Sequence, residues 1–86
     1  MSNNQFEKLV KQEVLKYANE HSDNQTITEE DVFIVWSCKT LQNNKALLST
    51  TQHDGMYYEL TYNGDKDELY FDAYKKVENI CIKPEA

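Results

Sequence analysis

The sequence predicts an α+β fold in which one amphipathic N-terminal helix packs on a four-stranded antiparallel β-meander. Three observations carry this prediction. Apolar residues recur at helical spacing near the N-terminus. β-branched and aromatic runs fill most of residues 32–82. Turn-forming residues interrupt those runs at three places, which are Gln42-Asn43-Asn44, His53-Asp54-Gly55 and Asn63-Gly64-Asp65-Lys66.

The predicted helix spans about residues 3–20. Its apolar residues follow one another in steps of three and four, which places them on one stripe with polar residues opposite. The stripe consists of Phe6, Leu9, Val10, Val14, Tyr17 and Ala18. A polar, turn-rich stretch at about residues 21–30 is predicted to be the loop that carries the chain to the sheet, which covers about residues 31–82.

The turns predict how the strands pair. We expect three-residue loops at the first two turns, where Asn44 and Gly55 tolerate positive φ, and a four-residue loop at the third. This registration pairs Leu48 with Leu60 and Leu60 with Leu69. A two-residue loop at Asn63-Gly64 would oppose Glu59 to Glu68, which is unfavourable on a sheet surface.

One face of the predicted sheet is strongly apolar. It should receive the helix, because a sheet with one apolar face must cover it with another layer. Trp36 is therefore expected to be buried between helix and sheet. This face carries Val32, Ile34, Trp36, Cys38, Ala46, Leu48, Met56, Tyr58, Leu60, Tyr62, Leu69, Phe71 and Ala73.

The opposite face is also rich in apolar side chains, which an ordinary solvent-exposed face is not. Such an aromatic patch with a polar surround is a common mark of a protein interface. The candidate partner-binding residues are Phe33, Val35, Leu47, Tyr57, Tyr70 and Tyr74. Two alternatives remain open: the C-terminal segment folds over this face, or a one-residue register slip exchanges the two faces.

The segment from Tyr74 to Ile82 has mixed periodicity. Ala73, Val77 and Ile80 have helical spacing, whereas Ile80 and Ile82 alternate as in a strand. We expect a long, bulged last strand, with a short C-terminal helix on the sheet as the alternative.

Length and charge limit the classes of function. A chain of 86 residues has room for a single domain with a modest core. Lys and Arg number 9 and Asp and Glu number 15, which gives a net charge of −6 and disfavours direct nucleic-acid binding. The apolar runs are shorter than a membrane span, and the N-terminus lacks the basic and apolar regions of a signal peptide. We therefore expect a cytoplasmic protein without a membrane partner.

The sequence offers no convincing catalytic, metal or cofactor site. His21, Cys38, His53 and Cys81 are zinc-ligand types, but they lack the close pairs of small zinc domains. The two cysteines are expected to be buried thiols. The stretch 63–68 has the composition of a calcium loop without its order of ligands. We therefore expect a protein that is not an enzyme and binds neither cofactor nor metal.

The stretches 32–48, 54–64 and 72–76 resemble a small uncharacterised family encoded by bacteriophages and prophages of Gram-positive bacteria. The resemblance covers most of the chain. It implies a phage accessory protein made inside the host cell, and it implies no activity.

The sequence and this resemblance together predict a non-enzymatic protein-binding module that acts on a host or defence protein. One alternative is a structural or regulatory homodimer of the phage with no host target. Another is an acidic nucleic-acid mimic that occupies a basic groove. The mimic would use Glu29, Glu30, Asp31, Asp65, Asp67, Glu68 and Asp72.

Overall fold

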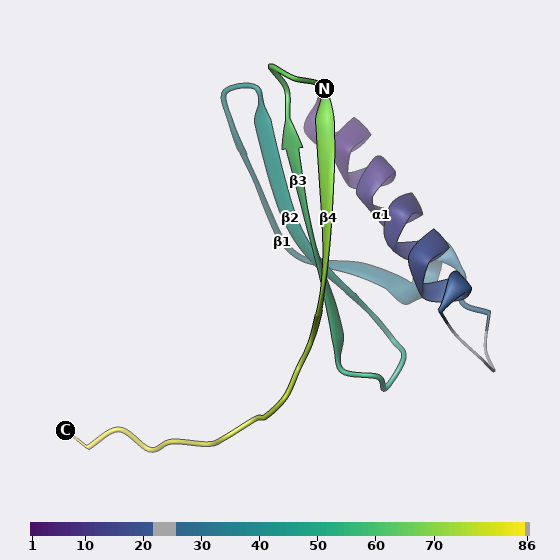
Figure 1. The fold of residues 1–86 in the computed structure, drawn as a ribbon. Helices are drawn as coiled ribbons and strands as arrows, with labels where there is room; N and C mark the ends of the chain where they lie inside the picture. The colour runs from purple at the N-terminus through teal and green to yellow at the C-terminus, as the bar shows by residue number, and fades with distance from the viewer. Residues whose placement is uncertain (22–25, 86) are drawn as a thin grey trace.

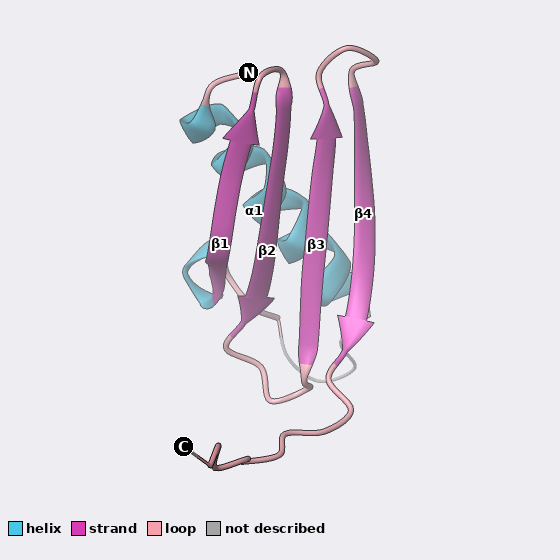
Figure 2. Ribbon diagram, turned by 90° about the vertical axis from the view of Figure 1, so that its left-hand side faces the viewer, coloured by secondary structure: helices cyan, strands magenta, loops and turns pink. Residues whose placement is uncertain are grey.

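The computed structural model of the protein describes residues 1–21 and 26–85. The four strands form one antiparallel sheet in the order β1-β2-β3-β4, and the N-terminal α-helix lies across one of its faces (Figures 1 and 2). The predicted α+β class and meander are therefore confirmed. The elements are α1 (Asn3–Glu20), the short 3-10 helix η1 (Glu29–Asp31), β1 (Val32–Thr40), β2 (Asn43–Thr50), β3 (Met56–Asn63) and β4 (Glu68–Lys75).

Helix α1 occupies the predicted range because both of its ends are defined by hydrogen bonds. The Ser2 hydroxyl accepts from the Gln5 N–H at 3.1 Å, and the Gln5 side chain accepts from the Ser2 N–H at 2.9 Å, which forms a capping box. At the other end, the Asn19 amide exchanges two hydrogen bonds with the backbone of Ile27, at 2.9 and 3.2 Å. This pair holds the chain that returns to the sheet against the helix.

The loop predicted at residues 21–30 can be compared only at its ends, because residues 22–25 lie outside the described residues. The last part of the predicted loop contains the short 3-10 helix η1, Glu29–Asp31. Ile27 is buried and joins the core.

The core lies between α1 and the sheet face that it covers, here called the helix face. The predicted apolar stripe of α1 supplies four buried residues, Phe6, Val10, Val14 and Ala18. Tyr17 extends the contact, with its ring 5.6 Å from that of Tyr58 and 5.1 Å from that of Phe71. The sheet contributes the buried side chains of Val32, Ala46, Leu48, Tyr58 and Leu60.

The pairing of β2, β3 and β4 differs from the predicted one by two residues. Leu48 pairs with Tyr58, and Leu60 pairs with Phe71. The first difference arises because the connection between β2 and β3 has five residues, 51–55, rather than three; Gly55 adopts the expected positive φ of 71°. The last loop has the predicted four residues but begins one residue later, at Gly64. A shift of two residues leaves every side chain on the same face.

The pairing of β1 and β2 corrects the prediction for Trp36. The turn between them has two residues, Leu41 and Gln42, and the ladder contains a β-bulge between Ile34 and Trp36. One inserted residue moves everything after it to the other face. Trp36 consequently pairs with Leu47 and is 43% exposed, so the prediction of a buried Trp36 is wrong.

The bulge also changes the sheet face on which the residues after Trp36 lie. Cys38 pairs with Lys45 and is exposed, which contradicts its expected place in the core. Lys39, the residue after Cys38, lies on the helix face, and its Nζ donates to the Met1 carbonyl at 3.0 Å.

The sheet ends earlier than predicted. Strand β4 stops at Lys75, and the next residue, Lys76, donates its N–H to the Gly55 carbonyl at 2.7 Å. Residues 76–85, here called the C-terminal tail, form neither the expected strand to residue 82 nor the alternative helix. The tail leaves the body of the protein instead of folding over the sheet (Figure 1).

Candidate protein-binding surface

The candidate surface is the outer face, meaning the sheet face opposite α1. Figure 2 looks onto this face and shows α1 behind the strands. Cross-strand pairing arranges its central residues in three rows. The rows are Phe33, Ser49, Tyr57 and Tyr74; then Trp36, Leu47, Glu59 and Asp72; then Cys38, Lys45, Thr61 and Tyr70.

Large apolar side chains on this face remain open to solvent. Phe33 is 45% exposed, and Tyr70 and Tyr74 are each 51% exposed. Leu47 and Tyr57 are half-buried among their neighbours. Val35 lies at the bulge and is 46% exposed. Strand pairing therefore places five of the six sequence-predicted residues on the outer face, and Val35 is exposed at the bulge beside them.

Trp36 also belongs to this surface, and sequence reasoning missed it. The available signal was the run Val32–Trp36, in which five consecutive apolar residues break the alternation of a half-buried strand. Such a break is typical of a bulge as well as of a strand that is buried on both faces. Only the pairing with β2 distinguishes the two.

Polar residues lie among the aromatic residues of the outer face, chiefly on the central strands β2 and β3, and their interactions are weak. Lys45 and Glu59 lie 3.6 Å apart as a partly exposed ion pair at the surface, an interaction that usually contributes little to stability. The Tyr70 hydroxyl donates to the Glu68 carboxylate, and this hydrogen bond raises the pKa of Tyr70. Asp72 lies opposite Glu59 in the ladder, so the face contains a like-charge pair after all.

The zinc-ligand types identified in the sequence do not converge. The two thiols are exposed, Cys38 on β1 and Cys81 in the C-terminal tail. His21 stacks on Tyr17 at the end of α1, with ring centroids 3.9 Å apart, and His53 lies in the β2–β3 connection. Within residues 1–21 and 26–85, no three His, Cys, Asp or Glu residues are placed to hold a metal ion.

The stretch that resembles a calcium loop is held by hydrogen bonds of its own. The Asn63 side chain accepts from the N–H groups of Asp65 and Lys66 at 3.1 and 3.3 Å. The Tyr62 hydroxyl donates to Asp67 at 2.6 Å, which raises the pKa of Tyr62. These bonds define a polar hairpin turn.

A small cleft lies beside the start of α1. The charged side chain in its lining is that of Lys39, which already donates to the Met1 carbonyl. Its lining residues are Met1, Lys39, Leu41, Gln42, Tyr62 and Gly64. This chemistry points to no reaction, so the outer face is the stronger candidate site.

Together, the fold and this surface define a small α+β domain with one covered and one open sheet face. The chain belongs to a family of unknown function, DUF6275, whose match spans residues 6–84. Comparisons with curated proteins and with solved structures found no match. Among the described residues, no helix has the length and apolar character needed to span a membrane.

Proposed function

We propose that this protein is a small, non-enzymatic protein-binding module whose outer face is the contact surface. One observation carries the proposal: Phe33, Trp36, Tyr70 and Tyr74 are each between 43% and 51% exposed on one uncovered sheet face. Exposed rings contribute little to folding, whereas burial against a partner removes apolar surface from water. Tyrosine and tryptophan are also enriched at the centres of protein interfaces.

The class of partner is a protein, either a host or defence protein or a second copy of this chain. The resemblance to proteins encoded by phages and prophages supports a role inside an infected bacterial cell. Small acidic phage proteins commonly act by binding, which is the reason for proposing an accessory role rather than catalysis.

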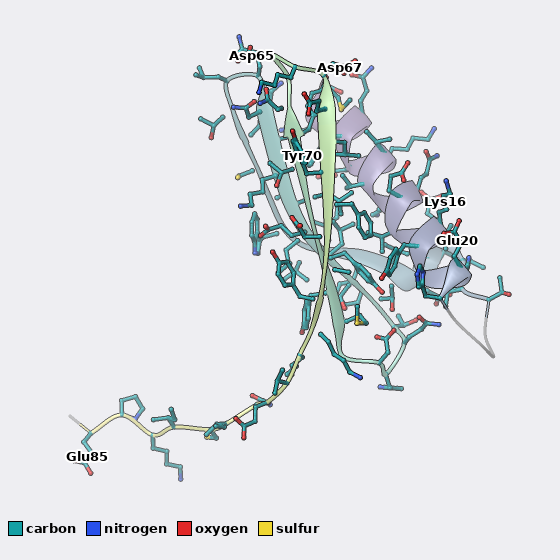
Figure 3. All side chains as sticks on the ribbon, viewed as in Figure 1. Lys16, Glu20, Asp65, Asp67, Tyr70 and Glu85 are labelled. Carbon is teal, nitrogen blue, oxygen red and sulfur yellow. The ribbon has the colours of Figure 1, made fainter. Side chains whose placement is uncertain are left out.

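The acidic residues support mimicry of nucleic acid less well. Glu29, Glu30 and Asp31 precede β1, whereas Asp65 and Asp67 lie in the turn between β3 and β4. In an antiparallel meander the start of β1 and the end of β3 are at opposite ends of the sheet. Figure 3 shows Asp65 and Asp67 at the end of the sheet that lies far from the C-terminal tail. The acids are thus divided between two places instead of forming one continuous surface.

The double variant Tyr70→Ser/Tyr74→Ser tests the proposal. Self-association and capture of bacterial proteins should both be lost, while the melting temperature should stay within a few degrees, because surface substitutions usually cost little. Leu41→Ala is the matched control, since it removes an 83% exposed apolar side chain from the β1–β2 turn, outside the outer face. A folded double variant that binds everything the parent binds would refute the proposal, and an unfolded one would show that the face is core.

A further inference from the structure

We infer that the outer face is covered by a second copy of this chain, with the C-terminal tail of each copy lying against the outer face of the other. This inference rests on the proposed function of the outer face and names its partner. It adds the C-terminal tail, whose residues 76–82 were predicted to be part of the sheet.

The C-terminal tail has the side chains of a strand without a surface to pack on. Val77 is 94% exposed, Ile80 is 64% exposed and Ile82 is 78% exposed. Flexible tails that stay in water are poor in β-branched residues, because such residues favour packing against a neighbour. These three side chains therefore indicate a segment that is buried in an assembly.

The direction of the tail brings it to the same side as the outer face. In Figure 1 the tail leaves the end of β4 on the side of the sheet away from α1, and in Figure 3 Glu85 lies at its far end on that side. Figure 2 shows the tail passing beyond the ends of the strands, from the β4 side toward the β1 side. The tail does not cover its own sheet, but it extends into the space that a molecule docked on the outer face would occupy.

The accessible area is large enough to include an interface of standard size. A compact monomer of 10.1 kDa exposes about 5,300 Å². This protein exposes 6520 Å², and its radius of gyration is 14.8 Å, whereas a compact domain of its length has about 12 Å. The excess of about 1,200 Å² exceeds the roughly 800 Å² that each partner loses in an interface of standard size.

A second copy of this chain can cover the outer face and also provide a surface on which the C-terminal tail packs. The uncovered face and the unpacked tail belong to the same chain, so a two-fold exchange covers the face and packs the tail in each protomer and leaves neither open. Charge is compatible with this arrangement, because Lys76 and Lys83 of the tail are balanced by Glu78 and Glu85. In the part of the chain that the structure describes, neither lysine forms an ion pair, and neither does Asp72. A tail lysine can approach the acidic pair of Glu59 and Asp72 across the interface.

The first experiment measures assembly of the full chain. Light scattering with size separation should give a dimer, and dilution should give its dissociation constant. The variant Val77→Ser/Ile80→Ser/Ile82→Ser should raise that constant about tenfold or more, as expected when several apolar contacts are lost. Leu41→Ala, the same control as above, should leave the constant unchanged.

The second experiment asks where the tail lies. Trp36 is the single tryptophan and sits on the outer face, so it serves as an energy donor in a Cys38→Ser/Cys81→Ser protein. The acceptor protein carries Trp36→Phe and Cys38→Ser with a dansyl group on Cys81. Mixing the two should produce energy transfer, since the tail of one copy would lie near Trp36 of the other.

The control acceptor carries dansyl on Gln12→Cys, an exposed position of α1, in a Trp36→Phe/Cys38→Ser/Cys81→Ser protein. It should give less transfer, because α1 lies behind the sheet. A protein that remains monomeric, a dimer insensitive to the tail substitutions, or greater transfer from the helix position would each overturn the inference. After any of those results, the proposed function would still stand if Tyr70→Ser/Tyr74→Ser abolished capture of another protein. If that variant bound its partners normally, both the inference and the proposed function would be wrong.

Discussion

Asp31 links two parts of the chain that are distant in sequence. Its carboxylate accepts from the Thr28 N–H at 2.9 Å and from the Thr51 hydroxyl at 3.2 Å, and its carbonyl accepts from the Thr51 N–H at 2.9 Å. The hydrogen bond from the Thr28 backbone is the main cause of a pKa below the usual value of 3.8, with the threonine hydroxyls adding to it. One carboxylate thereby joins η1 to the start of the β2–β3 connection.

Asp31 should make stability depend on pH in the acidic range. Because its pKa is lowered on folding, the unfolded chain binds more protons, so the stabilisation is present above about pH 4 and is lost as the pH falls through the folded pKa. Asp31→Asn should reduce the drop in unfolding free energy between pH 6 and pH 3, measured with urea. Glu30→Gln is the control, since that neighbouring exposed carboxylate has no hydrogen bond among the described residues. Equal drops in parent and Asp31→Asn would contradict this role.

Leu41 is an unfavourable residue for its position. It has a φ of 55° in the two-residue turn between β1 and β2 and is 83% exposed, so it gains little from burial. Leu41→Gly should raise the unfolding free energy by about 0.5–1 kcal/mol, because glycine adopts positive φ without strain. Leu41→Ala keeps the Cβ atom and should show no such gain in urea titration; a gain as large as that of glycine would point to the exposed side chain rather than the backbone.

At the scale of elements, the bulge in β1 decides which side chains reach the outer face. It also interrupts the hydrogen-bonding edge of an exposed strand, which discourages edge-to-edge pairing. The extra residue of the bulge is Val35. It has no partner in β2, whereas Ile34 and Trp36 on either side of it pair with the adjacent residues Leu48 and Leu47. The faces of residues 36–40 depend on their pairing with β2, not on their distance from Val32.

Deleting Val35 should therefore leave a folded protein with Trp36 still on the outer face. The ladder becomes regular, since Ile34 and Trp36 already pair with the adjacent residues Leu48 and Leu47. Acrylamide quenching of Trp36 in dilute protein should be close to that of the parent, with a modest fall in melting temperature. Deleting Ser37 from the regular part of the strand is the control and should be strongly destabilising. Protection of Trp36 after the Val35 deletion would show that the register slipped.

At the scale of the whole molecule, the protein has two layers and a core on one side only. Its principal extents are 43 × 42 × 19 Å, so it is a thin body in which one sheet face and the tail carry apolar surface without cover. The two faces of the sheet should consequently differ in what they contribute to stability.

Truncating one aromatic residue on each side of the sheet tests this asymmetry. Phe6 is 1% exposed against the helix face, so Phe6→Ala should cost about 3–5 kcal/mol of unfolding free energy. Trp36→Ala should cost about 1 kcal/mol, because surface substitutions usually cost little. Both should be measured by urea denaturation in dilute protein, where self-association adds little to stability. Similar losses for the two variants would show that the outer face is also core.

The sequence by itself determined the elements that depend on local chemistry. The helical spacing of Phe6, Val10 and Val14 and the polar residues opposite them specify α1, whose ends the structure places where they were predicted. The turn signals specify a four-stranded meander. Because the pairing errors in β2, β3 and β4 were of two residues, Leu47, Tyr57, Tyr70 and Tyr74 were still assigned to the correct side. Phe33 lies before the bulge in β1 and also kept its side.

Only the tertiary structure decided what depends on a partner strand. The bulge that exposes Trp36 is a property of the ladder between β1 and β2, and no local pattern distinguishes it from a fully buried strand. The end of β4 has the same kind of cause: β3 begins at Met56, which pairs with Lys75, so the chain beyond Lys76 has no strand beside it. Residues 77–82 have the composition of a strand, but a strand needs a neighbour for its backbone hydrogen bonds, and this neighbour is absent from the described part of the chain.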